Sequence, residues 1–302
     1  MATTNPLVSS LLPYVEQNAG ELLTKSMLDG KARSLFQLMT GVKESSVAIN
    51  IMDVDPQFTE LSCGWNESGS TEFTQRMIDP AGLQVEMAFC AKNLLKSWAQ
   101  HQVVVTAGKE NLPFEEKWTG MIVDKINEKL ENMIWYGQSA QTNQFCGILT
   151  TAQADDNVID VTSSSAATAY AFLKDIAKAI PAKVKDAVIL CSTPLYREYM
   201  QDLVAANLYH YDPANGENEY RLPGTDIKVI AVNGLNNLAN DGKEYAVATR
   251  LSNLVWGISA DGDEDTFDLF YEPSEREFRL VVSFCAGTNY AFSDEVVLGI
   301  RG

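Results

Sequence analysis

The sequence predicts an α+β protein organised around one long helix. Three observations support this prediction: a long amphipathic stretch before residue 137, alternating apolar and polar residues upstream of it, and a mixture of short helix and strand patterns downstream. A helix with one buried stripe repeats apolar residues every three or four positions, whereas a half-buried strand alternates them. Both periods occur in this chain, so both kinds of element are expected.

The long helix is predicted between Pro113 and Gly137. Pro113 suits the first turn, because its missing N–H is not needed there, and Gly137 can adopt the left-handed conformation that ends a helix. One apolar stripe lies between them, made of Trp118, Met121, Ile122, Ile126, Leu130, Met133 and Ile134. We expect Trp118, Ile126, Leu130 and Trp135 to belong to the structural core.

A β-hairpin is predicted from residues 71–78 and 83–90, in which apolar and polar residues alternate. The four linking residues favour a turn, because Pro80 presets the first central dihedral angle and Gly82 follows where a small residue is favoured. A two-stranded ribbon is marginal in water by itself, so a projecting arm would need a partner to cover it. The alternative is a hairpin within one sheet.

These elements together resemble a known family. The long helix is followed by Trp135-Tyr136-Gly137, a polar loop and Gly147-Ile148-Leu149-Thr150. This order resembles the major capsid protein of tailed double-stranded DNA bacteriophages, which has the Hong Kong ninety-seven fold. The resemblance covers nearly the whole chain in element order. It implies a long spine helix, a peripheral β-sheet, an extended β-hairpin arm and a central α/β axial domain.

The resemblance also implies a division of the chain and a set of subunit contacts. The expected parts are an N-terminal arm at 1–48, the extended hairpin arm and its flanks at 49–100, the peripheral domain with the spine helix at 101–137, the axial domain at 138–252 and the return strands of the peripheral domain at 253–302. Both arms would lap neighbouring subunits, with contacts at Trp65, Phe73, Arg76 and Met77. Covalent crosslinking of subunits is not predicted, because nothing near Lys92 marks an acceptor or a catalytic carboxylate.

Helices and strands alternate in the predicted axial domain. The expected elements are a helix between the serines at 163–165 and Pro181, a buried strand over Ala187–Cys191, a helix capped at Ser192 and a strand at 227–232. An α/β enzyme is the alternative, but the strand that ends at Cys191 is not followed by a glycine-rich phosphate loop. Ser192 or Thr193 could be a nucleophile near Tyr196 and His210, yet a helix cap explains these hydroxyls without a catalytic site. Further strands are expected at 267–271, 278–284 and 296–300.

The formal charge of −17 argues against direct reading of nucleic acid, because such proteins neutralise phosphates with clustered lysine and arginine. An acidic inner wall can still surround packaged DNA, which it would repel instead of gripping. No apolar stretch approaches the roughly 20 residues that span a bilayer, and the N-terminus lacks the features of a signal peptide. We therefore expect a protein made in the cytosol without membrane association.

Metal and cofactor sites are not expected. The five cysteines are widely separated, which favours buried free thiols over a disulfide framework or a zinc site: Cys63, Cys90, Cys146, Cys191 and Cys285. Ligand positions of a calcium loop are matched by Asp261, Asp263, Asp265 and Glu272. Thr266 stands where that loop needs glycine, so a solvated acidic turn is the simpler interpretation.

The function implied by the resemblance is structural, not enzymatic. The protein would assemble with itself into hexamers and pentamers of an icosahedral phage head that encloses double-stranded DNA. Assembly would occur in the bacterial host cytoplasm, and the product would be the virion capsid. Scaffolding, portal and decoration proteins would be its partners. The alternatives are an encapsulin-like shell around a protein cargo and a cytosolic α/β enzyme.

Overall fold

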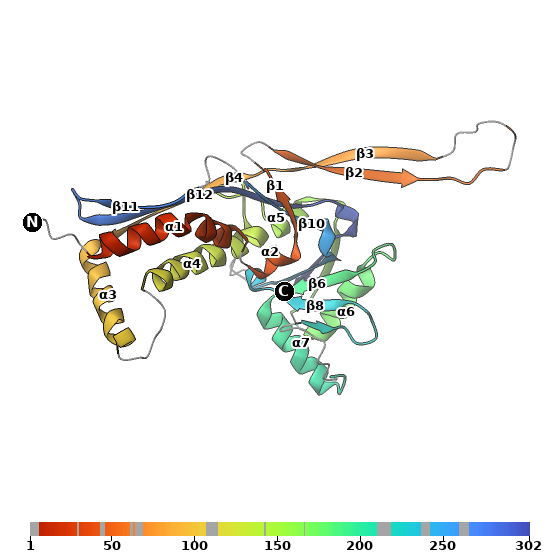
Figure 1. Ribbon diagram of the computed structural model, residues 1–302. Coiled ribbons are helices and arrows are strands. Elements are labelled where there is room, and N and C mark those ends of the chain that lie inside the picture. Colours follow the sequence, from red (N-terminus) through yellow and green to blue (C-terminus); the bar gives the residue numbers. More distant parts are fainter. Residues whose placement is uncertain are drawn as a thin grey trace, which may run out of the picture.

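The fold consists of a body with two sheets and a long ribbon that projects from it (Figure 1). The computed structural model describes residues 6–28, 30–42, 46–60, 63, 69–106, 114–141, 143–165, 167–209, 219–236, 242–259 and 266–302. The helices are α1 (Pro6–Leu28), α2 (Lys31–Leu35), α3 (Ala91–Thr106), α4 (Phe114–Tyr136), α5 (Ile148–Ala154), α6 (Ala169–Ala179) and α7 (Thr193–Ala205), with short 3-10 turns η1 (Asn233–Leu235), η2 (Leu251–Asn253) and η3 (Ser293–Glu295). Since strands make up the two sheets and the ribbon, the predicted α+β class is confirmed.

The predicted long helix is confirmed as α4, which ends at Tyr136, but Gly137 does not have the predicted left-handed conformation. Pro113 lies outside the described residues, and Gly137 is not among the residues with positive φ. A Cβ atom on Gly137 would lie 2.3 Å from the carbonyl oxygen of Phe145. The returning chain is fixed there by a hydrogen bond of 2.9 Å, which Gly147 N–H donates to the Gly137 carbonyl. Glycine is therefore required by close packing of two backbones and not by a left-handed conformation.

The first sheet is built around the longest strand, β12. It contains β1 (Gln37–Thr40), β10 (Leu254–Ile258), β12 (Glu277–Tyr290), β11 (Thr266–Glu272) and β4 (Ala81–Cys90), with β4 paired to β12. Alternate residues of β12 are buried, as in Phe278, Leu280 and Val282, because one face of the sheet packs on helices. The strands predicted at 267–271 and 278–284 are confirmed in this sheet.

The N-terminal segment packs on its own chain. Helix α1 lies against α4 and β11, where it buries Leu11, Val15, Leu22 and Met27. At helix α2, which follows α1, Glu131 Oε1 of α4 accepts a hydrogen bond of 3.1 Å from Ala32 N–H and lies 3.8 Å from Arg33 Nε. Burial raises the pKa of Glu131, although Arg33 and the backbone N–H groups act to lower it. Residues 6–28 thus use their apolar face within the chain, and the expected contact of this segment with a neighbouring subunit stays a prediction.

The second sheet is the predicted axial α/β unit. It contains, in order, β5 (Ile159–Ser163), β13 (Val297–Arg301), β9 (Glu244–Arg250), β6 (Ala187–Cys191), β8 (Lys228–Ala231) and β7 (Glu219–Arg221). The strand at Ala187–Cys191 and the helix capped by Ser192 are confirmed, since Ser192 Oγ accepts a hydrogen bond from Leu195 N–H. The preceding helix, α6, is capped by Thr168.

The closing strand β13 lies in this second sheet, whereas the sequence placed all of 253–302 with the peripheral domain. It pairs with β5 on one side and β9 on the other. Val297 and Leu298, which point to opposite faces of the sheet, are completely buried, as expected of a strand that is covered on both sides. Gly299 allows α6 to approach, because a Cβ atom there would lie 2.3 Å from Ile176 Cδ1.

The projecting ribbon is formed by strands other than those predicted. It consists of β2 (Val47–Asp55) and β3 (Ser70–Ile78), which pair along their whole length, while β4 pairs with β12. The sequence had paired residues 71–78 with 83–90 through a turn at Pro80. The prediction is wrong because Leu83 and Val85 pair with Phe284 and Val282 and complete the buried face of the first sheet. The residues of the turn at Pro80 do not indicate this distant pairing.

Candidate assembly surfaces

The projecting ribbon carries an exposed apolar face, here called the arm face. Residues directly opposite in an antiparallel pair point to the same side, and so do alternate residues along each strand. Met52 lies opposite Phe73, so these two share a side with Val54 and Met77. Their exposed fractions are 61% for Met52, 50% for Val54, 77% for Phe73 and 46% for Met77. Four large apolar side chains thus face solvent together in this single chain.

The opposite side of the ribbon is anchored to the body at its base. Ile78 is completely buried, and a Cβ atom on Gly287 would lie 2.9 Å from Ile78 Cγ2. Gly257 approaches the same side chain. The two glycines on β10 and β12 therefore make the seat on which the end of β3 rests.

Next to this seat, Arg76 connects the ribbon to β12 and to the end of α5. Its Nη2 donates a hydrogen bond of 2.7 Å to Asp155 Oδ2, and its Nε donates one of 3.2 Å to Asn289 Oδ1. The guanidinium lies 4.1 Å from the centroid of the Tyr290 ring, whose hydroxyl also donates to Asp155 Oδ2. Asn289 Nδ2 donates to the Met77 carbonyl at 2.7 Å. We call Arg76, Asp155, Asn289 and Tyr290 the arm clamp.

The charge state of the clamp is set by its hydrogen bonds. Burial by itself would raise the pKa of Asp155, but hydrogen bonds from Arg76, Asn157 and Tyr290 and the charge of Arg76 lower it below its ordinary value. Burial raises the pKa of Tyr290, which keeps the phenol protonated as a donor. At neutral pH the clamp is therefore an ion pair with a neutral phenol beside it.

The predicted contact residues thus occupy different environments. Phe73 and Met77 lie on the arm face, whereas Arg76 points to its own body. Trp65 lies outside the described residues. Arg76 is therefore engaged within its own chain, and the subunit contacts expected at Phe73 and Met77 stay predictions.

The four expected core residues lie on α4, at different depths. Ile126 and Leu130 are buried, and Trp135 is completely buried in edge-to-face contact with Phe36 at 5.7 Å between ring centroids. Trp118 is half-buried and contacts Phe89 at 5.1 Å. The difference arises because Trp135 is enclosed between Phe36 and Gly234 of η1, whereas Trp118 lines two hollows at the surface.

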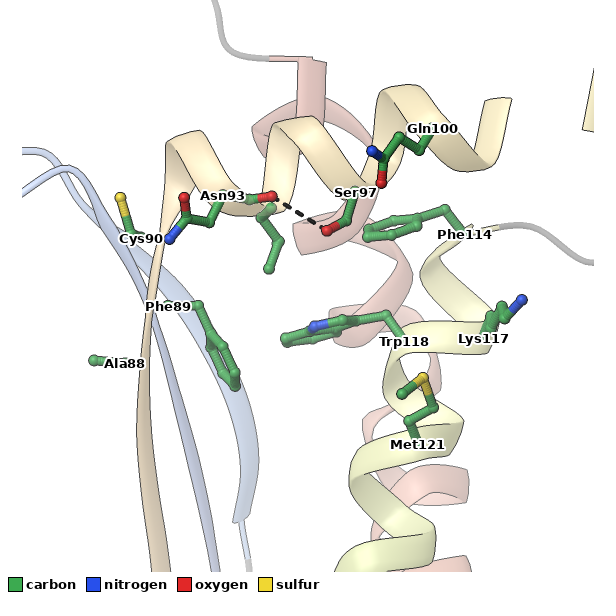
Figure 2. Close-up of a pocket in the computed structure, with 11 residues that line it drawn as sticks. Ala88, Phe89, Cys90, Asn93, Ser97, Gln100, Phe114, Lys117, Trp118 and Met121 are labelled. Atoms are coloured by element: carbon green, nitrogen blue, oxygen red, sulfur yellow. Dashed lines mark hydrogen bonds between the residues drawn. The ribbon is translucent and has the colours of Figure 1, made fainter. Parts of the chain in front are cut away.

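A groove runs between α4 and β4, on the inner side of the first sheet. Its first hollow, of about 620 Å³, lies between α3, α4 and β4 (Figure 2), and its second, of about 480 Å³, continues along α4. The Phe89 and Trp118 side chains point toward one another between the two hollows and line both. We call this the spine groove; its apolar lining includes Val85, Met87, Phe89, Trp118, Met121 and Met133.

The charged residues that line the spine groove within the described chain are all lysines. They are Lys117, Lys125 and Lys129. The spacing of four and eight residues places them on one side of α4 together with Met121, whereas Glu116, Asp124 and Glu128 lie one position earlier and so on the neighbouring side. The sequence analysis missed this groove, although the pattern of lysine and methionine at helical spacing was a visible signal.

The remaining candidates do not form a site in the described part of the chain. Asp261, Asp263 and Asp265 lie outside it, and Glu272 accepts hydrogen bonds from Ser274. The described residues contain no group of metal-ligating side chains, and the described helices include none that could cross a membrane. The predicted burial of the cysteine thiols is confirmed for Cys191 and Cys285 and is wrong for Cys63 and Cys90, which are exposed, while Cys146 is half-buried. Ser192 caps α7, and His210 lies outside the described residues.

The fold matches those of solved capsid structures. No family model and no curated protein matches the sequence. A chain of the satellite phage P4 procapsid with its size determination protein superposes with a TM-score of 0.63 at 9% identity, covering 93% of this chain and 89% of that one. A chain of the capsid of an empty GTA particle gives 0.57 at 13%, covering 91% and 89%. A virus-like particle from Pyrococcus furiosus gives 0.53 at 8%, covering 94% and 98%. The chain has the fold of phage capsid proteins, and the predicted Hong Kong ninety-seven type fold is confirmed.

Proposed function

We propose that this chain is a major capsid protein, the repeating structural unit of an icosahedral shell. The observation that carries the proposal is the arm face, an apolar surface on a projecting ribbon, in a chain with the fold of phage capsid proteins. The role is structural and not enzymatic. Hexamers and pentamers of the chain are the expected building blocks.

The arm face supplies a physical reason to assemble. A two-stranded ribbon is marginal in water without a covered face, and Met52, Val54, Phe73 and Met77 remain uncovered in the single chain. A neighbouring copy that covers them removes apolar surface from water. Obligate interfaces bury on the order of 2,000 Å² or more, so stability would belong to the shell more than to the monomer.

The contents and partners of the shell follow from the same proposal. The chain carries 40 acidic and 23 basic residues, so its average field repels DNA and suits enclosure without sequence-specific binding. Scaffolding, portal and decoration proteins are proposed partners. Assembly is proposed to occur in the bacterial host cytoplasm, with the virion capsid as the product.

Replacing arm-face residues tests the proposal. Met52→Ser and Phe73→Ser should abolish shells while leaving a folded subunit, as measured by sedimentation and negative-stain imaging. Val204→Ser is the matched control, because Val204 and Met52 are both 61% exposed, but Val204 lies on α7. Shells that form equally well from all three variants, or a wild-type chain that stays monomeric with scaffold, would contradict the proposal.

The material inside purified shells separates the proposal from its alternatives. Nuclease-protected DNA in particles from infected cells is the expected result. A protein cargo in place of DNA would indicate an encapsulin-like compartment, and small oligomers with turnover would indicate an enzyme. Neither alternative is favoured by the structural similarity to phage capsids.

A further inference from the structure

We propose that the spine groove binds an acidic amphipathic helix of another protein. The proposal concerns a surface on the body and not the arm face. It does not depend on shell formation, because the groove is complete within one chain.

Some apolar side chains that line the groove remain exposed to solvent in the single chain. Val85, Met87 and Phe89 point to the same side of the sheet as the buried residues of β12, yet Met87 remains 39% exposed. Across from them, Met121 is 62% exposed on α4. Methionine side chains adapt to irregular apolar partners, and they recur at binding surfaces that accept amphipathic helices.

The positive charge of the groove favours a negatively charged partner. Its three charged lining residues are lysines in a chain of net charge −17. Lys125 forms an exposed ion pair of 2.5 Å with Glu128 on its own helix. Such exposed pairs are worth little, so a partner carboxylate can replace Glu128 at small cost. A basic partner would meet like charges along the whole helix wall.

The spacing of the lysines matches a helix. Along α4 they lie about 12 Å and then about 6 Å apart, given a rise of 1.5 Å per residue. A partner helix aligned with α4 has the same rise, so its carboxylates would need the same spacing of eight and four residues. Its apolar side chains would then enter the hollows on either side of Phe89 and Trp118 (Figure 2).

Helices α1, α6 and α7 of this chain do not offer such a partner. Helix α1 buries Leu11 and Val15 on its own body, α6 buries Phe172 and α7 buries Tyr199 and Leu203. Their apolar faces are already in use. The arm face is free, but it is a ribbon anchored at the clamp. These observations favour a helix from a different protein over a second copy.

A pair of synthetic peptides tests both the shape and the charge of the partner. The first is a labelled helix of about 20 residues, which is about 30 Å long, with leucine on one face and glutamate on its flanks. The second is identical except that lysine replaces glutamate. We expect the acidic helix to bind at least about tenfold more tightly in fluorescence anisotropy, and to weaken when NaCl rises from about 50 to 500 mM.

Two substitutions place the binding site. Met121→Glu should weaken the acidic peptide by about tenfold or more, because it puts a like charge at the centre of the groove. Val204→Glu on α7 is the matched control, since Val204 is 61% exposed, and it should leave binding unchanged. Lys125→Glu with Lys129→Glu should reverse the preference between the two peptides. A melting curve of each variant tests whether its fold is intact.

Three results would overturn the proposal. One is equal binding of both peptides, another is binding that survives Met121→Glu, and the third is equal binding of an extended peptide with prolines that forbid a helix. Self-association that Met121→Glu abolishes, without peptide binding, would assign the groove to a second copy instead. Shell formation is tested separately with Met52→Ser and Phe73→Ser, so failure here is distinguishable from failure of the capsid proposal.

Discussion

The arm and the six-stranded sheet are both made of strands, but they differ in what lies beside each strand. Strand β6 has β8 and β9 on its two sides and all five of its residues are buried. Strands β2 and β3 are paired only with each other in the described chain, and the four large apolar side chains of the arm face are exposed to solvent. The same local chemistry therefore gives a buried core in one place and an exposed apolar surface in the other. A strand is stable within one chain only when that chain supplies its neighbours.

Removing Trp135 should have the largest effect on the body. The side chain is completely buried, and truncation to alanine leaves a large cavity, so Trp135→Ala should cost about 3–5 kcal/mol of unfolding free energy. Urea unfolding followed by circular dichroism measures this loss. Trp118→Ala is the control and should cost less, because Trp118 is half-buried. Equal losses at the two positions would contradict the burial described here.

The contrast between arm and body also explains which elements the sequence could predict. Ala187–Cys191 and α4 were predicted because their signals are local: a short apolar run, and a stripe at helical spacing. The pairing of β4 with β12 was missed because it joins segments far apart in the chain, while Pro80 suggested a nearby turn. The spine groove was missed because α4 alone reads as a core helix. Only the placement of β4 shows that Met121 faces a hollow.

Breaking the arm clamp should have the next largest effect. Arg76→Ala leaves Asp155 without its cation and one of its donors, which should cost about 1–3 kcal/mol. A double-mutant cycle with Asp155→Asn isolates the pair, and its coupling should exceed about 0.5 kcal/mol. Additive losses would mean that the two side chains act independently.

Lowering the pH should weaken the same clamp without mutation. The pKa of Asp155 is lowered in the folded chain, so its stabilisation is present above the ordinary carboxyl pKa of about 3.9 and is lost as pH falls through the lowered value. Glu131 acts in the opposite sense, because its raised pKa makes its contribution greatest when it is protonated. The difference in unfolding free energy between wild type and Asp155→Asn should therefore be largest near neutral pH and shrink below about pH 4. A constant difference across this range would exclude the ionised clamp.

The smallest effect on the single chain should come from the arm face. Phe73 is 77% exposed and lies opposite Met52, so Phe73→Ser removes a side chain that already contacts water. The unfolding free energy of the monomer should change by no more than about 0.5 kcal/mol. In the assembled state the same substitution should release subunits, because a buried aromatic anchor at an interface is worth about 2 kcal/mol or more. Measuring monomer unfolding and particle dissociation on one preparation gives both quantities. A large loss in the monomer would mean that the arm face is covered within the chain, and the contrast with the six-stranded sheet would then disappear.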